Sequence, residues 1–197
     1  MPAGTVPSTR PDWRKVGEMV LRDGDEFRGL IKTLKRERLV APGTGTPVCF
    51  DSGALHRLVP HRPPMLLVDG IDAVSVATGA VCGHRTLRAD DLGFAGHFPD
   101  EPIYPGTLVV EAMGQLALTL WHFAGERRTD LPTDLRPKRV RATHVHHASF
   151  LAPFRPGDTM TLQARVLDQS ITMMTACQAW NGDVLGAFAI AEVYLDE

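Results

Sequence analysis

The chain lacks the features that mark several classes of protein. Its 197 residues include three cysteines, Cys49, Cys82 and Cys177, which are spaced too widely for a zinc knuckle or a disulfide framework. No apolar run approaches the ~20 residues that cross a bilayer. The N-terminus has no apolar stretch behind a basic start, so no secretory signal is predicted. A reducing cytoplasm is the simplest location.

An excess of charge of one sign is also lacking. The net charge is -2, from 21 basic and 23 acidic residues, which gives no reason to expect nucleic acid or an anionic membrane as a partner. Hydrophobic residues make up 44% of the chain, enough for an ordinary globular core. The length suits one domain, or one domain with an appendage.

The composition changes near residue 50. Residues 1–10 are rich in Pro, Ser, Thr and Gly and are predicted to be disordered. From Trp13 to Leu39 apolar residues recur at helical spacing, and Gly24 divides this stretch into two short predicted helices. Residues 41–47 have a linker composition. We therefore expect an N-terminal extension over residues 1–50 and a main domain over residues 51–197.

The main domain is predicted to be α+β. Residues 107–123 form a nearly all-apolar segment whose length favours a buried helix. Asn181-Gly182 predicts a type I′ hairpin turn. Strand patterns occur at residues 65–76, 79–87, 139–150, 159–167, 171–180 and 184–195. Together they predict a long antiparallel sheet wrapped on one central helix.

The residues with the clearest chemical potential lie between Gly96 and Gln115. His97 sits in a loop rich in Gly and Pro, and Glu111 follows in the apolar helix. Desolvation would raise the pKa of Glu111 and let it act as an acid, with Gln115 one turn later to hold it. His97 would act as a base without further help. The plainer alternatives are a helix charge and a structural histidine.

Pro105-Gly106 opens the predicted helix between these two residues. A glycine at this point lets the backbone approach a ligand closely. The free N–H groups of the first helical turn would then face any oxygen placed there. The plainer alternative is that Pro105-Gly106 is only a turn that starts the helix.

Five motifs follow one another along the chain: Leu58 to Asp69, Gly96 to Pro99, Pro105-Gly106, Val110 to Gln115 and Phe150 to Asp158. In order and spacing they closely resemble the β-hydroxyacyl-[acyl-carrier-protein] dehydratases of fatty-acid synthesis. The resemblance spans about residues 51–197 and implies a hotdog fold paired into a dimer or higher homo-oligomer. The extension is absent from compact members of that family, so we expect it to cover the acyl tunnel or to extend the dimer interface.

The resemblance also implies a division of labour. His97 would remove the C2 proton of a (3R)-3-hydroxyacyl thioester, and Glu111 of the partner subunit would protonate the departing hydroxyl. The Gly106 N–H and the following helix would bind the thioester carbonyl. Phe98, Pro105 and Gln115 complete the expected oxyanion and substrate-binding residues. The product would be a trans-2-enoyl thioester, formed without a cofactor or a metal.

A basic segment follows the predicted helix. Arg136, Lys138, Arg139 and Arg141 form a local excess of positive charge that would suit an acidic acyl carrier protein bearing a phosphopantetheine thioester. The alternative is a solvated loop and strand edge.

Three histidines, His144, His146 and His147, follow in the next predicted strand. No Cys, Asp or Glu near them in sequence completes a ligand set, so ordinary strand histidines are expected and zinc is not. His144 and His146 should share one face of the strand, with His147 on the other.

Two other functions fit the same fold class. A hotdog thioesterase would use a carboxylate to activate water against the thioester carbonyl, and a non-catalytic subunit would bind acyl chains or scaffold a synthase. The presence of both His97 and Glu111 favours the dehydratase over either.

Overall fold

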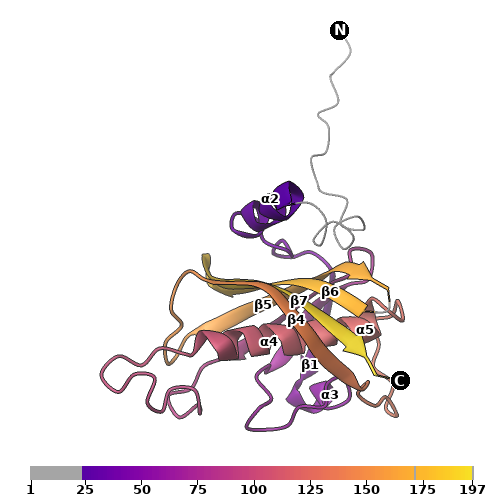
Figure 1. Ribbon diagram of the computed structural model, residues 1–197. Coiled ribbons are helices and arrows are strands. Elements are labelled where there is room, and N and C mark those ends of the chain that lie inside the picture. The colour runs from indigo at the N-terminus through magenta and orange to yellow at the C-terminus, as the bar shows by residue number, and fades with distance from the viewer. Residues whose placement is uncertain (1–23, 171, 197) are drawn as a thin grey trace.

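The computed structural model describes residues 24–170 and 172–196 (Figure 1). The helices are α2 (Gly24–Leu34), α3 (Ser52–Leu55), α4 (Gly106–Leu118) and α5 (Leu120–Phe123). The strands are β1 (Thr46–Asp51), β2 (Gly70–Ser75), β3 (Ala80–Thr86), β4 (Val140–Phe150), β5 (Thr159–Gln169), β6 (Thr172–Asn181) and β7 (Val184–Leu195). None of the helices in these residues is long and apolar enough to span a membrane.

The strands form one antiparallel sheet in the order β1-β2-β3-β5-β6-β7-β4. The long strands β4 to β7 curve around α4, which lies against their concave side (Figure 1). This arrangement confirms the expected α+β hotdog layout. It leaves β1 and β4 as the two edges of the sheet.

Helix α4 is the centre of the main core. Ala112, Met113 and Leu116 are fully buried along it, within the cluster that joins the helix to the sheet. The predicted single helix over residues 107–123 is divided at Thr119, which separates α4 from α5. The Thr119 hydroxyl donates to the Leu116 carbonyl at 2.6 Å, a local bond of the kind that bends helices.

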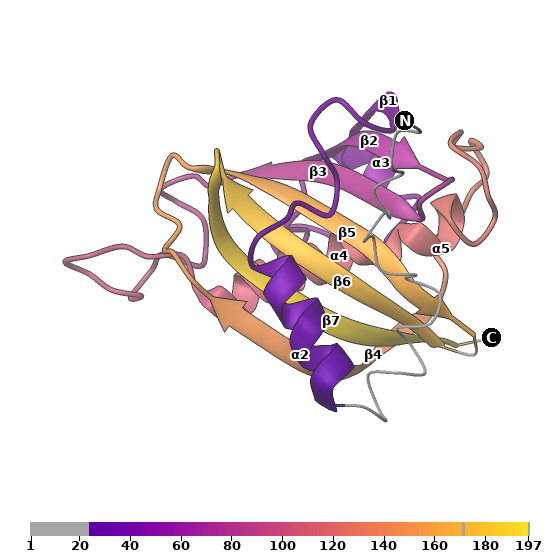
Figure 2. The ribbon, with the colours of Figure 1, turned by 90° about the horizontal axis from the view of Figure 1, so that it is seen from above.

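Residues 24–40 cover the face of the sheet opposite α4. Helix α2 lies across β6 and β7 on that side (Figure 2). Leu30 and Leu34 of α2 share a second buried cluster with Trp180, Phe188 and other residues of the outer face. The predicted helix after Gly24 is therefore confirmed, and its apolar stripe has a docking surface. The helix predicted before Gly24 lies outside the described residues.

Two buried glutamines of the sheet bind the backbone that follows α2. The Gln178 amide donates to the Leu34 and Glu37 carbonyls at 2.8 Å and accepts from the Leu39 N–H at 2.9 Å. Gln163 pairs with both backbone groups of Val40, at 2.8 and 3.1 Å. Each amide thus satisfies backbone groups that would otherwise be buried without partners. These hydrogen bonds fix the segment after α2 to the outer face of the sheet.

Arg38, in the segment after α2, contacts the hairpin between β6 and β7. Its guanidinium lies 4.2 Å from the Trp180 ring centroid and donates to the Gly182 carbonyl at 2.5 Å. Replacing Arg38 with alanine is expected to lower the free energy of unfolding by about 1–2 kcal/mol, since the cation–π contact and the hydrogen bond are lost. Urea unfolding measures the change.

The exposed Arg36 provides the matched control for this prediction. Its alanine variant is expected to stay within about 0.5 kcal/mol of the unsubstituted chain. If the Arg36 and Arg38 variants lost equal free energy of unfolding, the contacts of Arg38 with Trp180 and Gly182 would add no stability.

One predicted strand start and one predicted turn position were wrong. The strand expected over residues 65–76 begins only at Gly70, because Leu66, Leu67 and Val68 are buried in a loop against α4 instead of in the sheet. The last hairpin turns at Gly182 and Asp183, not at Asn181-Gly182, as Asn181 still pairs with Val184. Of the two central residues of this turn only Gly182 has positive φ, as in a type II′ turn.

Candidate functional site

The loop before α4 holds His97 in place through its own backbone. The Ile103 N–H donates to the His97 carbonyl at 3.0 Å, and Phe98 and Glu101 exchange two backbone hydrogen bonds at 3.2 Å. Arg155 from the loop before β5 binds Glu101 at 2.7 Å and ties the loop to the sheet. The imidazole is therefore presented on a loop that its own backbone hydrogen bonds close.

The hydrogen bond of His97 decides which ring nitrogen can act as a base. Nδ1 lies 2.9 Å from the Ile103 carbonyl oxygen, which can only accept. Nδ1 therefore carries the hydrogen in the neutral ring, and Nε2 keeps a free lone pair. The side chain is half-buried and borders the groove described next.

His97 borders an apolar groove of about 490 Å³. The groove is lined by His97, residues 103–107, Val109, residues 150–154, Gly186 and Ala187. Its size is in the range of small-molecule sites, and its lining provides few polar side chains. Such a surface suits an aliphatic ligand that needs a single base.

The start of α4 contributes to the same groove. Pro105 caps the helix without a side-chain hydrogen bond, and both Pro105 and Gly106 line the groove. Leu108 and Val109 donate to the Pro105 carbonyl, so Gly106 and Thr107 carry the N–H groups that have no partner within the helix, and the helix start presents positive potential. A Cβ added at Gly106 would lie 2.6 Å from the Phe150 ring, so glycine here makes room for Phe150.

Phe98 does not line the groove. Its side chain is 55% exposed, and its ring stacks on the His97 imidazole with centroids 4.4 Å apart. Within one chain Phe98 therefore contacts the proposed base and not the proposed ligand space.

Glu111 lies on α4 in a polar cluster of its own. The Gln115 amide donates to Glu111 Oε1 at 2.8 Å, as the one-turn spacing suggested. Gln115 also donates to the Met65 carbonyl at 2.7 Å and accepts from the Leu67 N–H at 2.8 Å. One buried amide thus positions Glu111 and the loop before β2 together.

His61 is a neighbour of Glu111 to which the sequence reasoning assigned no role. Its Nε2 lies 3.4 Å from Glu111 Oε1, and its Nδ1 is buried without a hydrogen-bond partner in the described residues. The only signal was its place in the motif from Leu58 to Asp69. Nothing in that motif alone pointed to the helix that carries Glu111.

The single chain does not enclose Glu111 or bring it into the groove of His97. The Glu111 side chain is 40% exposed, so the expected desolvation on an apolar helix is not produced by one chain. The groove lining includes His97 and Gly106 but not Glu111. Within one chain, His97 and the start of α4 therefore line one groove, and the Glu111 carboxyl lies outside it.

Replacing Gln115 with methionine tests the bridge between Glu111 and the loop. The buried Leu67 N–H would lose its acceptor, which is expected to lower the free energy of unfolding by about 1–3 kcal/mol. Thermal or urea unfolding measures this loss. The same change at the exposed Gln169 is the control and should be nearly neutral. A neutral Gln115 variant would show that the loop does not depend on the amide.

The basic residues proposed to receive a partner lie near the end of α4, where Arg136 and Lys138 line a small cavity together with Leu118. Lys138 binds Glu126 at 3.0 Å, and this hydrogen bond holds the pKa of Glu126 below its usual value. Arg141 binds Asp196 at 2.5 Å, while Arg136 and Arg139 are exposed. At 1.5 Å per helical residue they lie roughly 20 Å from the start of α4.

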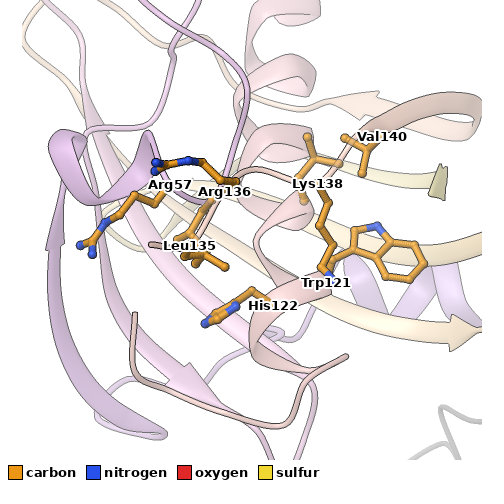
Figure 3. A pocket seen from close by; sticks show the side chains of 9 residues that line it. Arg57, Trp121, His122, Leu135, Arg136, Lys138 and Val140 are labelled. Carbon is orange, nitrogen blue, oxygen red and sulfur yellow. The ribbon is translucent and has the colours of Figure 1, made fainter. Parts of the chain in front are cut away.

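A second cavity lies beside these residues. It is lined in part by Arg57, Trp121, His122, Arg136 and Lys138 (Figure 3). Its volume is about 10 Å³, which is room for one water molecule. The cavity is too small for an organic ligand.

Comparison with known proteins places the chain beside acyl dehydratases. The FabA-like domain family matches residues 59–187. The 3-hydroxyacyl-[acyl-carrier-protein] dehydratase FabZ of Protochlamydia amoebophila is 34% identical over 121 residues, covering 61% of this chain and 73% of that protein. FabZ of Campylobacter jejuni is 38% identical over 118 residues, covering 60% and 77%.

A solved structure supports the fold. The dehydratase heterocomplex ApeI:P from Xenorhabdus doucetiae superposes with a TM-score of 0.58 at 17% identity. The match covers 78% of this chain and 93% of that one. At this identity the likeness extends to the fold alone.

Proposed function

This chain belongs to the FabA-like family, and on that premise we propose that it is a hydro-lyase acting on (3R)-3-hydroxyacyl thioesters. The substrate is carried on acyl carrier protein, and the product is the trans-2-enoyl thioester of fatty-acid or related biosynthesis. The observation that carries the proposal is the hydrogen bond from His97 Nδ1 to the Ile103 carbonyl. It leaves Nε2 as a base beside an apolar groove.

The first chemical task is removal of the C2 proton by His97 Nε2. The C2–H bond breaks and its electron pair moves toward the thioester carbonyl, so charge develops on the carbonyl oxygen. The N–H groups at the start of α4, near Gly106, line the groove and can stabilise that charge by hydrogen bonding. Preorganised donors of this kind cost no reorganisation during the reaction.

The second task is departure of the 3-hydroxyl. As the C2=C3 double bond forms, the C3–O bond breaks, and the leaving oxygen needs a proton because hydroxide leaves poorly. Glu111 in its acid form is the proposed donor. Gln115 holds that carboxyl in one orientation. The products are one water molecule and the enoyl thioester.

We assign Glu111 of this step to a second copy of the chain. Strand β4 is an edge of the sheet, paired only with β7 among the described strands. Its outer backbone groups form a template for another strand. Val145, Phe150 and Leu151, at and just after it, are each about half-exposed apolar side chains. A symmetric antiparallel pairing of two β4 strands would cover them and continue the sheet.

The same pairing accounts for the position of the basic residues. Antiparallel pairing about the middle of β4 places the start of one strand beside the end of the other. Arg139 and Arg141, at the start of β4, would then border the partner's Phe150, which lines the partner groove. An acidic carrier protein docked there would deliver its acyl arm to the groove of the opposite chain.

The decisive experiment follows the mass of the acyl group. A 3-hydroxyacyl carrier protein is incubated with the purified chain, and the acyl carrier protein is analysed by mass spectrometry. Loss of one water supports the proposal. Loss of the whole acyl group would identify a thioesterase, and an unchanged mass would identify a non-catalytic acyl-binding subunit. Either result overturns the proposed function.

A further inference from the structure

A cluster of possible metal ligands lies away from the groove, on the face of the sheet that carries α2. His144 and His146 come from β4, and Glu192 comes from β7. Glu192 pairs across the sheet with Met174, a residue of the cluster beneath α2, so its side chain lies on that face. The groove of His97 does not include any of the three.

The register of β4 explains how the histidines converge. It shifts against β7 between Ala142 and His144 and again between Val145 and His147. His144 and His146 stack with centroids 5.3 Å apart and an interplanar angle of 15°. His147, expected on the opposite face, instead stacks on Phe188 and contacts Phe27 of α2. The second shift turns it to the α2 side.

The two histidine–carboxylate distances are close to those of a metal site. His146 Nε2 lies 3.0 Å and His144 Nδ1 lies 3.7 Å from the same oxygen, Glu192 Oε2. One ligand atom from each of the three residues lies within 4.8 Å of the others. A tetrahedral zinc site with bonds of about 2.0–2.2 Å separates its ligand atoms by roughly 3.3 Å. Shifts of a few tenths of an ångström would bring both pairs to that spacing.

We propose that His144, His146 and Glu192 bind a divalent transition metal of the zinc type. Two imidazoles and one carboxylate are a ligand set that zinc commonly takes, with water in the fourth position. Glu192 and His146 are largely buried, with side chains 16% and 15% exposed, and are therefore held in place. His144 is 66% exposed and leaves the ion a path of entry.

The metal would act as a cross-link between strands. It would tie β4, the edge strand that is paired only with β7 among the described strands, to β7 through side chains. This location gives it no part in the proton transfers proposed for His97 and Glu111. Zinc binding can therefore be tested without an assay of dehydration, while the site itself lies at the middle of β4, the strand that the proposed function pairs with a second copy.

Titration calorimetry with zinc chloride tests the proposal on the untagged, chelator-treated full-length chain. One zinc ion per chain should bind, and a cobalt(II) titration should give the absorption bands of a low-coordinate site. His144→Ala, His146→Ala and Glu192→Gln should each weaken zinc binding at least about 100-fold, since even outer-shell partners cost roughly 10–100-fold. Thermal unfolding of the zinc-loaded chain should occur at higher temperature.

His84 provides the matched control, because its Nδ1 lies 2.9 Å from Asp72 in a histidine–carboxylate pair without a second histidine. His84→Ala should keep full zinc binding. Absence of zinc binding to the unsubstituted chain would overturn the proposal. Unchanged binding in the His144 variant would overturn it too, and that exposed position does not endanger folding.

Discussion

Replacing His97 with alanine is expected to lower the dehydration rate by about 10²–10⁴-fold, the usual contribution of a positioned general base. The reason is the free lone pair on Nε2, which follows because the Ile103 carbonyl accepts a hydrogen bond from the protonated Nδ1. Steady-state kinetics on a 3-hydroxyacyl carrier protein measures the loss. The effect should fall on kcat, because the apolar groove still binds the acyl chain.

His97→Asn separates the base from its structural bond. The asparagine amide can donate to the Ile103 carbonyl in place of Nδ1 but provides no base where Nε2 was. We expect it to retain the fold and melting temperature of the unsubstituted chain while losing as much activity as the alanine variant. Substantial activity in both variants would remove His97 from the mechanism.

Replacing Glu111 with glutamine is expected to give the second large loss of dehydration rate. The amide oxygen can still accept from Gln115, so the local hydrogen bond survives, but no proton can be delivered to the leaving hydroxyl. The rate of water loss should fall by about 10²–10⁴-fold. Single-turnover measurement of enoyl product on the carrier protein checks this. Normal turnover would place the acid elsewhere, with His61 the nearest alternative.

Mixing the two inactive variants tests whether the site is shared between chains. In a mixed dimer of His97→Ala and Glu111→Gln chains, one of the two sites would receive an intact base and an intact acid. Random re-pairing should therefore restore roughly a quarter of the unsubstituted activity. If each site were built from one chain, mixing would restore none. Restored activity would support a site shared between two chains, as the proposed pairing of β4 strands requires.

Much of the fold follows from local patterns. The all-apolar run after Gly106 has the length of a buried helix, and the alternating stretches after residue 139 have the period of strands in a long sheet. The apolar stripe that includes Leu30 and Leu34 was also predictable, because a 3.6-residue period appears in the sequence itself. The surface on which that stripe packs was not predictable. The sequence predicted that the extension covers the acyl tunnel or extends the dimer interface. In the described residues α2 lies on the outer face of the sheet, and the dimer-interface alternative stays a prediction.

The site divides in the same way. His97, Gly106, Glu111 and Gln115 lie close in sequence, and their residue types are enough to point to proton transfer. The role of Ile103 in orienting His97 was hidden, because a backbone carbonyl carries no sequence signal. The approach of His61 to Glu111 joins residues fifty positions apart, and only packing of the loop before β2 on α4 produces it.

The sequence by itself determined the chemistry available to this protein: a base, an acid, a helix start and an apolar fold to hold them. Those are properties of residue types and of short-range periodicity. Tertiary structure decided where each group meets its partner. It kept Glu111 out of the groove of its own chain, and it brought Glu192 to His144 and His146 from a distant strand. Strand register and helix docking depend on burial summed over the whole core, which no local pattern contains.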